Sequence, residues 1–155
     1  MNNRTSPSST ASQSPAQLLH EARDHFAIGI GIKAAELASA AIAVMEQNYA
    51  ANNPQLADAY ALKAAICTEV RLTFHGTELK QEHLRLALEA YKAEIACRQL
   101  GCETEALAKA HFLYGRTLAA DLGDSRGYQE IAKAMQILAS IARRDEVESK
   151  TAWLY

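Results

Sequence analysis

The chain carries the same eleven-residue pattern twice, 51 residues apart, and this repetition restricts its fold more than any other feature. The first copy, ADAYALKAAIC, spans residues 57–67, and the second, AKAHFLYGRTL, spans residues 108–118. Both place small residues at the same helical spacing, and a flat ring, Tyr60 or His111, stands at the same place in each. Two antiparallel helices reach the lower end of the usual ~8–10 Å separation only where Ala or Gly residues face each other. The pattern therefore predicts helical hairpins.

Helix-start and helix-stop signals divide residues 15–143 into six segments. Ser14 and Asn53 are capping residues, and each precedes a proline that can occupy the first helical position. Gly101 and Gly123 each follow a leucine where a helix is expected to end. Three prolines and seven glycines are few for a β-sandwich or barrel. We predict an all-α fold with helices at 15–28, 32–49, 55–74, 79–99, 103–122 and 127–143.

The hairpins resemble the tetratricopeptide repeat, which has a bulky residue at position 4, small residues at 8 and 20, and an aromatic near 24. The match runs in three hairpins over residues 15–143: Leu18, Ala22, Ala34, Ala38 and Ala41 in the first; Tyr60, Ala64, Ala87 and Tyr91 in the second; His111, Gly115, Leu118 and Ala132 in the third. The resemblance implies an irregular right-handed array of stacked antiparallel hairpins.

The chain departs from the usual 34-residue unit. Only the first hairpin keeps the standard spacing between positions 8 and 20. The second carries an insertion around RLTFHGTELKQEH, and we expect a shorter one around LGDSRGYQ in the third. Because small residues at this spacing also occur in other alanine-rich bundles, a different antiparallel helical bundle stays open as an alternative.

The resemblance implies that the first helix of each hairpin lines a concave, partner-binding face. Positions 2, 5, 9 and 12 would point into it. The partner-binding residues expected on this basis are aliphatic, aromatic and charged: Leu19, Arg23, Phe26, Asp58, Lys109, Phe112 and Arg116. Aromatic and arginine side chains are enriched among binding hot spots. Such a surface suits an amphipathic or acidic peptide or helix. Whether Phe26 and Phe112 belong to this face or to the core stays open.

Catalytic, metal and nucleic-acid functions find little support in the sequence. Sixteen Lys and Arg against 18 Asp and Glu give a net charge of −2, whereas nucleic-acid binders normally show a basic excess. His20 and His25 lie five residues apart and cannot share a metal as an i, i+4 pair can. No nucleophile or dinucleotide motif is complete. We expect no enzyme activity, no cofactor, no metal site and no nucleic-acid partner.

The ends of the chain and its cysteines bear on where the protein resides. Residues 1–14 are rich in Ser, Thr, Asn and Gln, which predicts a disordered tail ahead of a helical domain at 15–155. No apolar stretch reaches the ~20 residues that span a bilayer. Three cysteines, Cys67, Cys97 and Cys102, fit reduced thiols better than a disulfide framework. We expect a cytoplasmic protein without membrane contact.

The functional hypothesis is a non-catalytic protein-binding module, such as an adaptor, a regulator or a secretion-type chaperone. It would hold a peptide or helix of a partner in the concave groove. Two alternatives stay open: a subunit of a homo-oligomer or fixed complex, with a homodimer as its simplest form, and a helical bundle that binds a small molecule.

Overall fold

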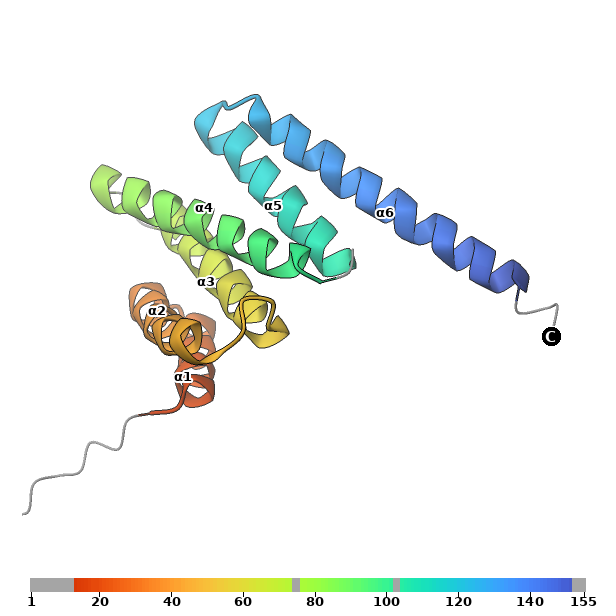
Figure 1. Ribbon diagram of the computed structural model, residues 1–155. Helices are drawn as coiled ribbons and strands as arrows, with labels where there is room; N and C mark the ends of the chain where they lie inside the picture. The colour runs from red at the N-terminus through yellow and green to blue at the C-terminus, as the bar shows by residue number, and fades with distance from the viewer. Residues whose placement is uncertain (1–12, 74–75, 102–103, 152–155) are drawn as a thin grey trace, which may run out of the picture.

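The computed structural model describes residues 13–73, 76–101 and 104–151, and its regular structure in these ranges is helical throughout (Figure 1). The helices are α1 (Pro15–Ala27), α2 (Gly31–Asn48), α3 (Pro54–Thr73), α4 (Thr77–Gln99), α5 (Glu105–Leu122) and α6 (Arg126–Thr151). The prediction of an all-α fold with six helices is confirmed over these residues. The predicted bounds agree within two residues except at the end of the last helix.

The helix ends use the side chains that the sequence suggests. Ser14 and Gln17 form a reciprocal capping box at the start of α1, and Asn53 accepts a hydrogen bond from the Gln55 backbone N–H at the start of α3. Gly123 ends α5 with φ of +62°, in the left-handed region that glycine enters without steric cost. Of the tail expected at residues 1–14, Gln13 and Ser14 alone lie inside the described residues.

Consecutive helices pair into three hairpins, α1–α2, α3–α4 and α5–α6, and each hairpin packs on the next through α2–α3 and α4–α5 (Figure 1). Two core clusters contain residues of all four helices α1, α2, α3 and α4, and a third contains residues of α4, α5 and α6. Small residues dominate the buried positions. Of the residues at the predicted helix–helix contacts, Ala22, Ala34, Ala38, Ala41, Ala64 and Ala87 are fully buried.

The closest helix contact lies between α5 and α6, where Gly115 faces Gly127. A Cβ atom added to Gly115 would stand 2.5 Å from the Gly127 carbonyl oxygen, and one added to Gly127 would stand closer still to the Gly115 carbonyl oxygen. Both separations are shorter than any real Cβ contact, so each glycine is required by the approach of the other helix.

The expectation for the third hairpin is therefore wrong in its second helix. The tetratricopeptide pattern puts Ala132 at the close contact, but Ala132 is exposed, and Met135 beside it is 66% exposed. Gly127 makes the contact instead, twelve residues after Gly115, which is the spacing of Ala22 and Ala34 in the first hairpin. No insertion is present, because the chain turns tightly over residues 123–125 and α6 begins at once.

The last helix is longer than predicted. The polar stretch RRDEVESK, expected to follow a helix ending near 143, continues α6 to Thr151. Arg, Glu and Lys are good helix formers, and neither glycine nor proline interrupts this stretch. Trp153, Leu154 and Tyr155 lie outside the described residues.

Replacing Gly115 with leucine is expected to force α5 and α6 apart. Overpacking of this kind costs about 1–3 kcal/mol of the free energy of unfolding. Chemical denaturation monitored by circular dichroism measures it. The matched control is Gly101→Leu, because Gly101 is exposed and a Cβ there would make only an ordinary contact 3.5 Å from the Arg98 carbonyl oxygen. Equal stability of Gly115→Leu and the wild type would contradict the contact.

Candidate functional site

A pocket of about 200 Å³ opens between α1, the end of α2 and the start of α3. Leu19, Met45 and Ala59 give it an apolar lining, while Arg23 and Asp58 supply a cation and an anion. Arg23 and Asp58 are both exposed, whereas Leu19 is 8% exposed and also belongs to the core. The structure thus brings together three residues that the sequence predicts for partner binding: Leu19, Arg23 and Asp58.

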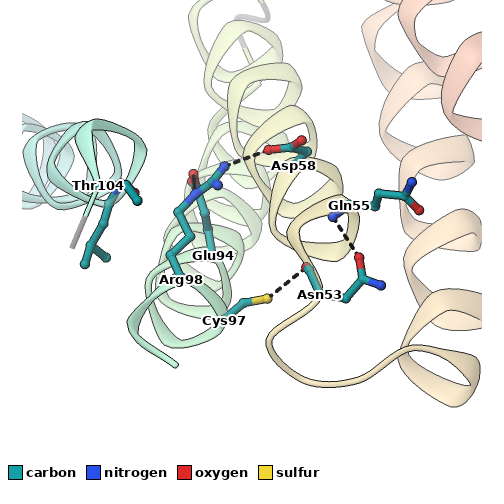
Figure 2. A network of polar contacts seen from close by, with 8 residues as sticks. Asn53, Gln55, Asp58, Glu94, Cys97, Arg98 and Thr104 are labelled. Atoms are coloured by element: carbon teal, nitrogen blue, oxygen red, sulfur yellow. Dashed lines mark hydrogen bonds and ion pairs between the residues drawn. The ribbon is translucent and has the colours of Figure 1, made fainter. Parts of the chain in front are cut away.

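Asp58 is also the outer end of a charged network that joins α3 to α4 (Figure 2). Arg98 on α4 donates to the Asp58 carboxylate over 2.9 Å through Nη2 and to the Glu94 carboxylate over 2.8 Å through Nε. The side chains of Arg98 and Glu94 are 15% and 6% exposed. Burial raises the pKa of Glu94, and the hydrogen bond and charge of Arg98 oppose that rise.

The pair of buried Glu94 and partly buried Arg98 replaces apolar residues found in the first hairpin. The small residue at the hairpin contact is Ala87 in α4 and Ala34 in α2. Seven and eleven residues after it, α4 has Glu94 and Arg98, whereas α2 has Ala41 and Met45. Both α2 residues are buried in the core. Sequence reasoning missed this pair because charged residues on a helix usually face solvent. Aligning the second helices of the hairpins would have shown charges at two core positions.

The predicted residues on α5 do not line the pocket. Lys109 is exposed, and its positive charge acts on Glu94 to lower the Glu94 pKa. Phe112 is 45% exposed, and Arg116 is exposed as well. Phe26, in contrast, is partly buried against the core cluster around Ala22 and Ala34. Of the two aromatic residues left open by the sequence, Phe112 offers a surface to solvent and Phe26 contributes to packing.

A larger and more polar cavity, of about 570 Å³, lies between the end of α4, the first half of α5 and the middle of α6. His111, which is 3% exposed, reaches it, and its Nδ1 bonds the Glu130 carboxylate over 2.6 Å. The Gln99 amide nitrogen lies 3.4 Å from the other ring nitrogen. Both nitrogens are therefore engaged within the fold. Sequence reasoning placed His111 at a packing position and did not find the cavity.

Cys67 and Cys97 are both buried with free thiols. The Cys97 thiol donates to the Asn53 backbone carbonyl over 3.3 Å, at the turn that begins α3 (Figure 2). Burial raises the pKa of Cys67 to about 11. Cys102 lies outside the described residues.

Two further properties concern metals and membranes. Within residues 13–73, 76–101 and 104–151, no group of three or more His, Cys, Asp or Glu side chains is placed to hold a metal ion. In the same ranges, no helix is both long and apolar enough to cross a membrane.

Comparison with known proteins gives no family for this sequence. No protein-family model matches it, and no curated protein matches it either.

Replacing Arg98 with methionine, the residue that α2 has at the corresponding place, is expected to leave Glu94 buried without its cation. Breaking a buried ion pair by removing one partner costs about 3 kcal/mol of the free energy of unfolding. The double variant Glu94→Ala with Arg98→Met copies the first hairpin, so we expect its stability to return to within about 1 kcal/mol of wild type. Denaturant titration of the wild type, both single variants and the double variant measures the coupling. Additive losses in the double variant would contradict the network.

The Arg98→Met variant should also show a dependence on pH. A carboxyl whose folded pKa is raised above its unfolded value destabilises the fold above that pKa, and this cost is relieved as pH falls. Without Arg98 the pKa of Glu94 should rise further. The stability deficit of Arg98→Met relative to wild type is therefore expected to shrink between pH 7 and pH 5. A deficit that stays constant or grows would show that Glu94 is not the source of the loss.

Cys67 and Cys97 are expected to resist alkylation in the folded protein, because the thiolate is the reactive form and both thiols are buried. Iodoacetamide at neutral pH, followed by peptide mass spectrometry, should label both residues only after denaturant is added. Rapid labelling of either residue in the native protein would contradict its placement in the core.

Proposed function

We propose that this protein is a non-catalytic interaction module that binds a segment of a partner protein on the side formed by α1, α3 and α5. The observation that carries the proposal is the pocket where Leu19, Arg23 and Asp58 meet. Its apolar lining suits one aliphatic or aromatic side chain of a bound segment. Its position between three helices of two hairpins means that the stacking of the hairpins builds the site.

Three exposed cations of α1 and α5 favour an acidic or amphipathic partner. Arg71, Arg85, Arg98 and Arg126 all form ion pairs with carboxylates. Within the described part of the chain, the side chains of Arg23, Lys109 and Arg116 form no ion pair or hydrogen bond. Exposed cations of this kind can pair with carboxylates of a bound segment and speed its association.

Phe112 offers a second anchor on the same proposed surface. It lies between Lys109 and Arg116 on one side of α5, and it is 45% exposed. A solvent-exposed phenylalanine flanked by cations can be covered by the apolar side of a bound helix while acidic residues of that helix meet the cations. The pocket and Phe112 would then contact different parts of one segment.

We include in this proposal that the hairpins are tetratricopeptide-like repeats. It is supported by the twelve-residue spacing of Ala22 to Ala34 and of Gly115 to Gly127, together with the pairing of consecutive helices into hairpins. Under this proposal the protein acts in the cytoplasm as an adaptor, a regulator or a secretion-type chaperone.

Selection from a random peptide display library tests the proposal, because it does not require the partner to be identified first. We expect the wild-type protein to enrich peptides that combine an apolar anchor with acidic residues. Arg23→Glu should weaken their binding by at least about tenfold, as is typical for loss of a favourable charge contact and introduction of repulsion. The matched control is Lys92→Glu, since Lys92 is an exposed cation on α4.

The outcomes separate the site from general electrostatics. Equal weakening by Lys92→Glu would show that net charge alone attracts the peptides. Unchanged binding by Arg23→Glu, or the absence of any enriched peptide, would contradict the proposed site.

A further inference from the structure

One exposed side of α6 is apolar over more than three turns. Its exposed residues follow helical spacing and carry no charge: Tyr128, Ala132, Met135, Leu138, Ala139 and Ala142. We call them the outer face of α6. Tyr128, Met135 and Leu138 are 69%, 66% and 48% exposed. Two other residues of the same helix, Ala134 and Ile137, are buried in a cluster with residues of α4 and α5. Because an apolar side of a helix is normally buried against another element, a helix with two apolar sides is expected to pack against something on each of them.

The preceding hairpins show what covers this side. We compare the position eight residues after the small contact residue, which is Ala34, Ala87 or Gly127. This position holds Ile42 in α2, Ile95 in α4 and Met135 in α6. Ile42 is buried in a cluster with Leu56 and Ala57 of α3. Ile95 is buried in a cluster with residues of α5. At each place the next helix of the chain packs on the residue, whereas Met135 lies on the last described helix, at the edge of the molecule (Figure 1).

The other end of the array is not built to cover the outer face of α6. In the first helix of a hairpin, the small contact residue is Ala22, Ala64 or Gly115. The positions eight and five residues before it are Leu56 and Ala59 in α3, and Leu107 and Ala110 in α5, and all four are buried. At the same places α1 has Ser14 and Gln17, which are exposed and form the capping box with each other's backbone. A polar terminal helix of this kind ends a stack. Head-to-tail joining of copies would bury these polar groups, so it is disfavoured.

We propose that the outer face of α6 is the interface of a homodimer, in which two α6 helices pack antiparallel about a two-fold axis at Met135. A two-fold contact requires a surface that is complementary to itself. Antiparallel pairing about Met135 sets Tyr128 opposite Ala142 of the second copy and Leu138 opposite Ala132. Tyr128 and Leu138 thus each meet an alanine, Met135 meets its own copy at the axis, and no like charges are brought together within the face.

This interface is separate from the partner-binding surface of the proposed function. The pocket is lined by residues of α1, α2 and α3, and none of the residues of the outer face of α6 lines it. Either proposal can therefore fail while the other stands.

Sedimentation equilibrium of the full chain over a range of concentrations tests the dimer. We expect twice the mass of the 16.9 kDa chain at high concentration. Met135→Lys should give a monomer, because two ammonium groups would meet at the axis. Leu72→Lys is the matched control: Leu72 is 61% exposed on α3, outside the proposed interface, and its variant should stay dimeric. Circular dichroism should show equal helical content in all three proteins.

Disulfide formation tests the symmetry. Under mild oxidation Met135→Cys should form a covalent dimer, because each introduced thiol meets its own copy at the axis. Tyr128→Cys should form far less, since that residue is expected to face Ala142. The wild-type chain, oxidised in parallel, shows what the native cysteines contribute.

Three results would overturn the proposal. The first is a wild-type chain that stays monomeric at the highest concentration. The second is a dimer that persists in Met135→Lys. The third is cross-linking of Tyr128→Cys as efficient as that of Met135→Cys.

Discussion

The close approach of paired helices is the constraint on which the rest of this structure depends. Each hairpin brings small residues to the point where its two helices cross: alanines in the first two hairpins, and Gly115 with Gly127 in the third. The glycine pair leaves no room for a Cβ on either side. The packing of α1 on α2, and of α2 on α3, brings residues of these three helices together around the pocket.

The second hairpin differs from the first in a way that bears on function. Where α2 has Ala41 and Met45, α4 has Glu94 and Arg98, and Arg98 reaches outward to Asp58 on α3. Buried charges are retained only when they are paired, and breaking such a pair is costly. The ion pair with Arg98 holds the Asp58 carboxylate beside the pocket. Arg98 is itself held by Glu94, so two residues of α4 position one residue of the proposed site.

Much of the fold follows from local sequence signals. The capping residues Ser14 and Asn53, the glycine at 123 and the alanines at the hairpin contacts each act within one turn or one helix pair, and these were predictable. The contact of Gly115 with Gly127 was not, because it depends on how tightly the chain turns at 123–125, and the sequence does not show loop length directly. The end of α6 was missed because residues 143–149 are exposed, so no alternation of buried and exposed positions marks them as a helix.

The site was harder to predict than the fold. Leu19, Arg23 and Asp58 line one pocket, and their places on α1 and α3 follow from the hairpin pattern. The same pattern could not show that Phe26 packs against the core while Phe112 is exposed, since that depends on the neighbouring helices. Glu94 and Arg98 were missed because their burial arises from tertiary packing.

Methyl NMR of the protein labelled at methionine tests whether a partner segment binds at the pocket. Of the three methionines, Met45 lines the pocket and Met135 lies at the centre of the outer face of α6. On addition of a selected acidic peptide, we expect the Met45 methyl resonance to shift while that of Met135 does not. A shift at Met135 with Met45 unchanged would contradict this expectation, because the peptide would then bind at the far edge of the array.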